Sequence, residues 1–533
     1  MSEKLYNNII LEDDFTREPN YPNKVPYLIN PPEVINITVG RQLFVDDFLI
    51  EETELTPEYH KAVKFDGNPV LSPEKPWETC FNPSATPKSG GVWYDEEEKI
   101  FKMWYEACWL HQMCYATSKD GIHWERPELD IVPGTNKILM RKNPNDENGP
   151  LIPIVPDSTA FFIDYDAPRE QRYKMQLHGP VSGPNARGII GTSADGVHWT
   201  VHNNTGICDD RTTMFYNPFR RKWVYSLRYS RGKDIIKEDD YLRTGRCRDY
   251  IEGDDFIEAS KWEPGDRRHW MSADKDDIPD PYIISTAVQD TEMAPQLYNV
   301  DCIGYESIML GMFEIHQGLC NTVFGNKGVP KITDLVPMYS RDGYHFSRPC
   351  RDPFIWSTRV RGSWDRGYVQ SVGGVCIING DELWIYYSGF AGDEKYDRSF
   401  SNDDNRTGMY RNGATGIAKL RRDGFVSMNG CGNLTTRKLE FTNKKTMGIN
   451  AVGKVKAHIL DENGNLLASS ELFEGDSTNH TLDFGGFDVS SLNGKVFRIK
   501  FDVDGKLYSF GFADKNGDFG GAHAAGIVDT ESK

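Results

Sequence analysis

The sequence predicts an all-β fold, in which a five-bladed β-propeller is followed by a small C-terminal β-sandwich. The first observation is a repeated phrase: residues 118–124 read SKDGIHW, 193–199 read SADGVHW, 340–346 read SRDGYHF, and a worn copy occupies 422–425. The aspartates of these copies lie 75, 147 and 81 residues apart, so one copy near position 266 has been lost. A unit of about 75 residues, used five times in β-rich sequence, is typical of a propeller.

The second observation is that each unit contains four strand-like runs. Asp-Gly between alternating apolar residues predicts a tight hairpin with positive φ at both turn positions. Ahead of it lie two further runs per unit, the inner strands at 91–95, 160–164, 213–217, 300–305 and 374–379 and their partners at 101–105, 173–177, 223–227, 308–312 and 383–387. The third unit lacks Asp-Gly and has a polar insertion at 231–277, which we expect to be a rim loop.

The third observation is a change of pattern after Thr435, where short alternating strands are separated by Asn-Gly and Asp-Gly turns. We therefore predict four parts: an N-terminal arm over 1–39, the propeller over 40–435, the sandwich over 436–517, and a flexible Gly/Ala-rich tail over 518–533.

Composition argues against several functional classes. The 533 residues include 61 basic and 79 acidic side chains, a net charge of −18, which disfavours nucleic acid or an anionic membrane as a partner. Ten cysteines without a CxxC pair predict neither a disulfide framework nor a metal site, and we expect no cofactor. The first 30 residues lack a signal-peptide pattern, so cytoplasmic residence is the default, with a removed leader left open. The oligomeric state is not predictable.

Candidate catalytic residues follow from aligning the blades. The start of each inner strand and the end of its partner meet at one mouth of the propeller, because the two strands are antiparallel. Asp157 and Asp210 then occupy equivalent places on adjacent blades. Asp301 lies two residues deeper than that position in the fourth blade, on the same face. We predict that these three carboxylates are catalytic.

Other side chains at the predicted mouth are candidates for binding substrate. The ends of the partner strands contribute Glu106, His178, Arg228, Glu314 or His316, and Ser388. Substrate binding is assigned to Glu106, Trp109, His178, Arg228 and Gln370, with Asp47 added in case the segment before the first blade folds into the mouth, and Glu306 in case the register is off by one blade. Facing carboxylates with flat aromatic rings suit glycosidic bond cleavage. The Asp-Gly aspartates and the neighbouring histidines are assigned to turns and packing.

The layout resembles the five-bladed propeller glycoside hydrolases of families 32 and 43. The phrases LFVDD at 43–47, SGGVWYD at 89–95 and DRTTMFYNP at 210–218 are similar to those of bacterial family-32-like glycosidases. The resemblance implies a propeller with an appended sandwich, and Asp157 matches the aspartate that family 32 has in its second blade. The family's first-blade Asn-Asp-Pro-Asn-Gly is replaced here by FNPS at 81–84, and its Glu-Cys motif is absent, with Asp210 on the equivalent blade.

These observations predict a glycoside hydrolase that removes a terminal sugar from an oligosaccharide or small glycoside, with fructo- or arabinofuranosides as the favoured class. His178, Arg228 and Gln370 would position the sugar. Three alternatives remain open at this point: a non-catalytic carbohydrate-binding propeller, a glycoside phosphorylase in which Arg228 and His178 hold phosphate, and an interaction scaffold that needs no inward-facing carboxylates.

Overall fold

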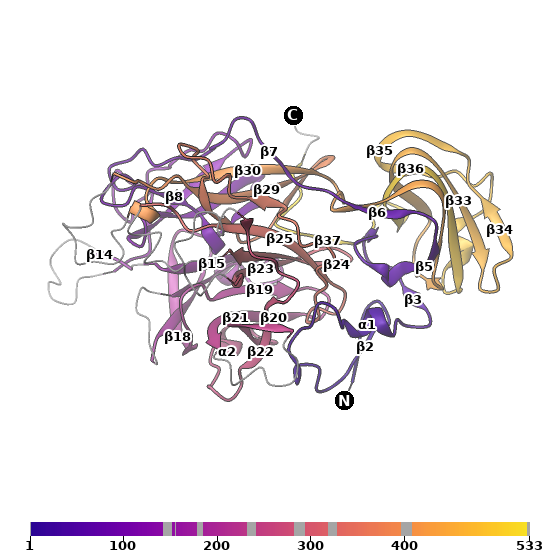
Figure 1. The fold of residues 1–533 in the computed structure, drawn as a ribbon, viewed down its shortest axis with the longest axis horizontal. Helices are drawn as coiled ribbons and strands as arrows, with labels where there is room; N and C mark the ends of the chain where they lie inside the picture. Colours follow the sequence, from indigo (N-terminus) through magenta and orange to yellow (C-terminus); the bar gives the residue numbers. More distant parts are fainter. Residues whose placement is uncertain are drawn as a thin grey trace.

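The computed structural model describes residues 2–141, 152–154, 156–178, 185–231, 241–281, 294–317, 328–395 and 408–529. Nearly all of its regular structure is β, arranged as a five-bladed propeller beside a second β domain (Figure 1). In the part of the chain that the structure describes, no helix is long and apolar enough to cross a membrane.

Each blade is an antiparallel sheet whose strands follow one another outward from the propeller axis. Blade 1 consists of β8 (Ala85–Thr86), β9 (Val92–Asp95), β10 (Ile100–Ala107), β11 (Gln112–Ser118) and β12 (Lys137–Ile138). Blade 2 consists of β15 (Ser158–Ile163), β16 (Tyr173–His178), β17 (Arg187–Ser193) and β18 (Trp199–Ile207). Blade 3 consists of β19 (Thr213–Asn217), β20 (Lys222–Arg231), β21 (Leu242–Gly253) and β22 (Arg268–Asp274). Blade 4 consists of β23 (Gln296–Glu306), β24 (Ile308–His316), β25 (Thr333–Ser340) and β26 (Ile355–Trp356).

Blade 5 closes the ring in a way that the repeat does not predict. It contains β27 (Gly367–Ser371), β28 (Ile377–Asn379), β29 (Glu382–Phe390) and β30 (Gly413–Arg421), and its outer strand is β7 (Val63–Lys64). Ala418 of β30 pairs with Lys64 of β7, so a segment from before blade 1 completes the last blade. The worn Asp-Gly at 423–424 therefore does not lead into a fourth blade strand. It leads into the second domain.

The Asp-Gly phrases form a wider turn than the predicted two-residue hairpin. In blade 2, Gly196 has φ 81°, while Asp195 is not among the residues with positive φ. The Asp195 carboxylate instead accepts hydrogen bonds from the backbone N–H groups of Val197 and His198, both at 2.8 Å. Its second oxygen lies 2.7 Å from the His198 ring. Asp120 and Asp342 make the same contacts in blades 1 and 4, because a carboxylate can satisfy two successive backbone donors.

These turns also join neighbouring blades. The indole N–H of Trp104 in blade 1 donates to the Gly196 carbonyl in blade 2, at 2.7 Å. Tyr386 of blade 5 donates to the Gly121 carbonyl of blade 1, also at 2.7 Å. A Cβ on Gly196 would lie 2.6 Å from the Trp104 ring, so glycine is required both by φ and by space. The turn that the repeated phrase forms is thus a contact between neighbouring blades.

Blade 3 is complete, contrary to the prediction of a rim loop over 231–277. The strands β21 and β22 both lie in that range, and the helix α2 (Phe256–Ala259) lies in the connection between them. Trp262 follows α2 and donates its indole N–H to the Ile207 carbonyl of blade 2, at 3.0 Å. The missing Asp-Gly is therefore replaced by a longer connection that still contacts the preceding blade.

The second domain contains one ten-stranded hydrogen-bonded sheet. Its strands are β3 (Ile35–Asn36), β4 (Gln42–Leu43), β5 (Ile50–Thr53), β6 (Thr56–Tyr59), β31 (Val426–Thr436), β32 (Leu439–Glu440), β33 (Thr446–Asp461), β34 (Leu466–Ser469), β35 (Phe473–Thr481) and β36 (Phe497–Ala513). Strands β4 to β6 pair with β36 and β31, so residues 42–59 join this domain instead of the propeller, where the sequence placed them. Phenylalanine, leucine and isoleucine side chains make up most of its core. Its description as a sandwich stays a prediction.

Both ends of the chain lie against the propeller. The arm contains β1 (Glu3–Lys4), β2 (Ile10–Leu11) and α1 (Pro26–Ile29), and it contacts the blade 4 turn, where Asn7 donates to the Arg341 carbonyl. The predicted flexible tail forms β37 (Ala522–His523), which pairs with β23. Small residues suit this path because Gly521 packs directly on the backbone of Glu306 and Gly40.

Candidate active site

The candidate active site lies where the inner strands begin. Asp157 immediately precedes β15, and Asp210 lies three residues before the start of β19. His178 ends β16 and pairs with Ser158, which places it beside Asp157, whose N–H donates to the His178 carbonyl at 2.7 Å. The antiparallel argument from sequence therefore brings these residues together.

Lys88 connects blade 1 to this cluster. The inner strand of blade 1 is interrupted by the short 3-10 helix η2 (Lys88–Gly90), in which Lys88 has φ 47°. Lys88 Nζ lies 2.5 Å from Glu106 Oε2, 3.2 Å from the Asp157 carbonyl and 3.6 Å from the centroid of the Trp109 ring. Trp109 stacks in turn on Tyr410, with ring centroids 4.4 Å apart. The carboxylate of Glu106 is thus paired with the Lys88 ammonium group in a buried ion pair.

Asp157 has an unusual affinity for a proton. Burial and the nearby negative charge of Asp210 raise its pKa to about 7, against the opposing charge of Lys88. Glu106 contributes in the same direction as Asp210. A carboxyl group with this pKa keeps its proton at mildly acidic pH and can donate it.

Asp210 has different surroundings. Its carboxylate forms an ion pair with the guanidinium of Arg228, and the same Arg228 nitrogen lies 2.8 Å from Asp209 Oδ2. The Asp210 side chain is 26% exposed. The two carboxyl groups on adjacent blades are both half-buried and differ in their neighbours: Asp157 retains its proton near further carboxylates, and Asp210 is paired with a cation.

Asp301 lies deeper and is held by three donors. Its Oδ2 accepts hydrogen bonds from Asn299 at 2.9 Å, from Ser89 at 3.2 Å and from Ser371. These donors come from blades 4, 1 and 5, so Asp301 ties the blades together around the axis. The predicted catalytic role of Asp301 is less suited to this arrangement than a structural one, since three donors converge on one oxygen.

The side chains of Gln370 and His178 are buried at the mouth of the propeller. Neither the amide oxygen nor the amide nitrogen of Gln370 has a hydrogen-bond partner among the described residues. Such unpartnered buried groups cost about 1–3 kcal/mol each, so a bound ligand or water is the natural partner. Burial lowers the pKa of His178, against the opposing charges of Asp210 and Asp209, which favours the neutral ring.

Two predicted binding residues lie elsewhere. Asp47 is exposed in the 3-10 helix η1 (Asp47–Leu49), between β4 and β5 of the second domain. Glu306 ends β23 at the opposite end of blade 4, where it forms an ion pair with Arg422 at 3.0 Å. Asp47 was misplaced because its segment pairs with the second domain. For Glu306, the alignment that put it at a turn away from the mouth holds.

Sequence reasoning missed part of the cluster. Glu314 on β24 is fully buried, and burial raises its pKa to about 7 against the charge of Arg211, whose guanidinium lies 3.4 Å away. The end-of-strand rule named Glu314 only as an alternative to His316. Arg211, Lys331, Tyr298 and Tyr368 gave no repeating signal, because each occurs in one blade only.

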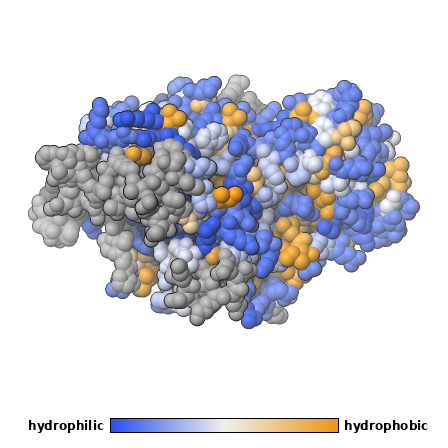
Figure 2. All heavy atoms as spheres, viewed as in Figure 1, coloured by the Kyte–Doolittle hydropathy of each residue, from blue (hydrophilic) through white to orange (hydrophobic). Residues whose placement is uncertain are grey.

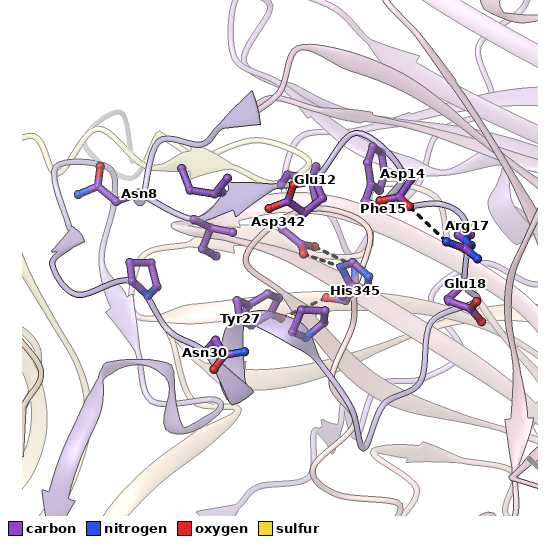
Figure 3. Close-up of a pocket in the computed structure, with 15 residues that line it drawn as sticks. Asn8, Glu12, Asp14, Phe15, Arg17, Glu18, Tyr27, Asn30, Asp342 and His345 are labelled. Atoms are coloured by element: carbon purple, nitrogen blue, oxygen red, sulfur yellow. Dashed lines mark hydrogen bonds and ion pairs between the residues drawn. The ribbon is translucent and has the colours of Figure 1, made fainter. Parts of the chain in front are cut away.

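Other features lie outside this cluster. A cavity of about 610 Å³ is formed by the N-terminal arm with Asp342 and His345, and none of the predicted site residues lines it (Figure 3). Figure 2 shows a mostly hydrophilic face with some hydrophobic colour over this arm, which exposes Ile10 and Ile29.

Two cysteine features are not indicated by the spacing of the cysteines in the sequence. Cys80 and Cys108 form a disulfide, with a Cα–Cα distance of 5.9 Å, next to Trp109. Cys247, Asp249 and His269 in blade 3 have potential ligand atoms within 4.8 Å of one another, although Arg267 also pairs with Asp249 at 3.1 Å.

Comparison with known proteins gives no family. No protein-family model and no curated protein matches the sequence. Solved structures do match. An N-acetylgalactosamine deacetylase from F. plautii, in complex with blood group B trisaccharide, is 13% identical, covers 70% of this chain and 96% of its own, and has a TM-score of 0.40.

Two further structures are similar at the same level. One is from the GH130 family of mannoside phosphorylases and of glycoside hydrolases that target β-1,2-mannosidic linkages in Candida mannan, with 13% identity, 68% and 94% coverage and a TM-score of 0.42. The other is a thermostable family-43 glycoside hydrolase, with 10% identity, 64% and 95% coverage and a TM-score of 0.39.

Proposed function

We propose that this protein is a glycoside hydrolase that cleaves a terminal sugar at the mouth of the propeller. The observation that carries the proposal is the contrast between Asp157 and Asp210. One carboxyl group retains its proton to about pH 7, and its neighbour is paired with Arg228. When one carboxyl group keeps its proton and its neighbour is paired with a cation, the two can supply the acid and the base or nucleophile of glycosidic cleavage.

In this mechanism Asp157 is the general acid. Its proton goes to the glycosidic oxygen as the bond to the leaving group breaks. Asp210 is the carboxylate that either attacks the sugar or activates a water molecule, and Arg228 holds it in place. The separation of the two carboxyl groups decides between these outcomes, about 5–5.5 Å for retention and about 6.5–9.5 Å for inversion.

The remaining predicted residues are assigned to the sugar. Trp109, whose ring faces are covered by Tyr410 and Lys88, is assigned to the sugar through its indole N–H, which has no partner among the described residues. Gln370, with both amide atoms unpartnered among the described residues, is assigned to sugar hydroxyl groups. His178 is assigned to the same hydroxyl groups. The proposed substrate is an oligosaccharide or small glycoside, with furanosides as the first class to examine.

The test is hydrolysis of a panel of aryl glycosides and of fructo- and arabino-oligosaccharides. Asp157→Asn and Asp210→Asn should each lower kcat/KM by roughly 10²- to 10⁴-fold. The matched control is Asp164→Asn, which changes a carboxylate at the other end of blade 2, paired with Lys174. Wild-type activity in both Asn variants, or no turnover of any glycoside by the wild type, would contradict the proposal.

A further inference from the structure

Basic side chains surround one aromatic ring on the blade 4 side of the mouth. Lys331 Nζ lies 4.5 Å from the centroid of the Tyr298 ring, with the guanidinium carbons of Arg246 at 5.7 Å and Arg211 at 5.9 Å. The ring of His316 stacks on Tyr298 at 5.9 Å. Three cationic side chains from blades 3 and 4 therefore converge on a single phenol.

These cations are poorly balanced by carboxylates. The partners of Lys331 are the Tyr298 hydroxyl at 2.8 Å and the faces of Tyr298, Tyr368 and Tyr410. Arg246 donates to the Gln296 side chain at 2.9 Å. Among the described residues, no carboxylate lies within 4.0 Å of either Lys331 or Arg246.

Several donors in the cluster are also unused. Nε and Nη1 of Arg211 and Nε of Arg246 are buried without a hydrogen-bond partner in the described residues. Within 4.0 Å, Arg211 has one acidic partner among the described residues, Glu314 at 3.4 Å. A buried cation left without an acceptor is strongly destabilising, and phenol rings compensate only part of that cost. Of the three cations, Arg211 alone has a carboxylate acceptor among the described residues.

We propose that Lys331, Arg246 and Arg211 form an oxyanion-binding subsite beside the catalytic carboxylates. Guanidinium groups match the oxygen pairs of phosphate and carboxylate groups. The inference rests on the proposed function, because Tyr410 joins the two regions: it stacks on Trp109 and lies 5.3 Å from Lys331 Nζ. The anion is either free inorganic phosphate that acts as a co-substrate or an acidic group on the sugar itself.

Burial and the charge of Arg246 hold the pKa of Lys331 well below its usual range. A bound anion would oppose that effect and favour the charged amine. The charges of Asp210 and Glu314 act in the same direction as the anion.

The experiment measures binding by calorimetry and by thermal shift, with inorganic phosphate, with glucuronate and galacturonate, and with neutral galactose. The wild type should bind at least one anion at least tenfold more tightly than galactose. Lys331→Met and Arg246→Gln should each weaken that binding at least tenfold. The matched control is Lys174→Met, a buried lysine that lies 5.6 Å from the Trp223 and Phe256 rings but is paired with Asp164.

The results separate the two sources and the two proposals. Binding of phosphate, with glycoside turnover that requires phosphate and releases a sugar phosphate, identifies a co-substrate, supports the subsite and replaces the proposed hydrolysis by phosphorolysis. Binding of uronates, with phosphate-independent turnover of acidic glycosides, identifies an acidic sugar. Equal binding of anions and galactose, or anion binding unchanged in two folded variants, overturns the subsite, whether or not neutral glycosides are cleaved. Anion binding without any glycoside turnover overturns the proposed function and leaves the subsite standing.

Discussion

Asp157 and Asp210 hold equivalent positions on adjacent blades, yet their contacts assign them different tasks. Burial and the negative charges of Asp210 and Glu106 raise the pKa of Asp157 to about 7. Asp210 shares the Arg228 guanidinium with Asp209. Chemical difference at symmetric positions is therefore produced by the neighbours: Lys88 and Glu106 beside one carboxyl group, Arg228 beside the other.

The pH dependence of turnover follows from this arrangement. If Asp157 donates the proton, activity requires its neutral form, so kcat/KM should decline as the pH rises through about 7, with the slope of one ionisation. Initial rates between pH 4 and pH 9 on the best aryl glycoside measure it. An aryl glycoside with a very acidic leaving group needs little protonation, so it should lose this decline. A decline that persists unchanged for that substrate would assign the ionisation to another group.

Stability should show the same group with a defined sign. Because the pKa of Asp157 is raised above its unfolded value of about 3.9, ionisation weakens the folded state progressively between about pH 4 and pH 7. Asp157→Asn should therefore gain stability over the wild type across that range, by roughly 2–4 kcal/mol, and hold the gain constant above it. Urea unfolding at pH 4, 6 and 8 measures the difference. Asp164→Asn should lose stability, since Lys174 loses its partner.

At the scale of elements, the Asp-Gly turns carry the connection between blades. Asp195 accepts two backbone N–H groups and the Ser193 hydroxyl, and Gly196 receives the indole N–H of Trp104. Desolvation opposes ionisation, but the His198 and backbone donors lower the pKa of Asp195 to about 2. The turn is therefore charged and fully bonded over the working pH range.

Asp195→Ala should lower the free energy of unfolding by about 1–3 kcal/mol, because two backbone donors lose their acceptor. Asp195→Asn keeps one side-chain oxygen and should cost less. Urea unfolding at pH 7 gives both values. The turn joins the strand ends opposite the mouth, so kcat and KM at 20 °C should stay at wild-type values in both variants. A selective loss of kcat with unchanged stability would mean that the turn communicates with the site.

Periodicity explains what the sequence could and could not predict. The blade repeat located Asp157, Asp210 and His178, since equivalent strand ends must meet at one mouth. It could not locate the cluster around Tyr298, because Lys331, Arg246 and Arg211 stand at different positions in their own blades. It also missed β7, whose partner β30 lies about 350 residues further along the chain, and Asp47, whose segment pairs with the second domain.

At the scale of the whole molecule, both ends of the chain help to hold the ring closed. Strand β7 completes blade 5 from the N-terminal side. From the C-terminal side, β37 pairs with blade 4, and the residues after it reach two more blades. Ile378 of blade 5 exchanges backbone hydrogen bonds with Gly526 and Val528, and His523 lies 3.2 Å from Glu96 of blade 1. Three blades are joined by one short segment.

Truncation after residue 519 should therefore destabilise the propeller without altering its chemistry. The deletion removes the β37 pairing and the buried Ala525 and Val528, a loss of a few kcal/mol that corresponds to a fall in Tm of about 5–10 °C. Differential scanning calorimetry measures it, with truncation after residue 529 as the control that keeps those contacts. Because β37 pairs with Tyr305 and Glu306, at the end of blade 4 opposite the mouth, kcat at 20 °C should be retained. Equal Tm values for the two truncations would show that the segment packs on the ring without holding it, and blade closure would then rest on β7 alone.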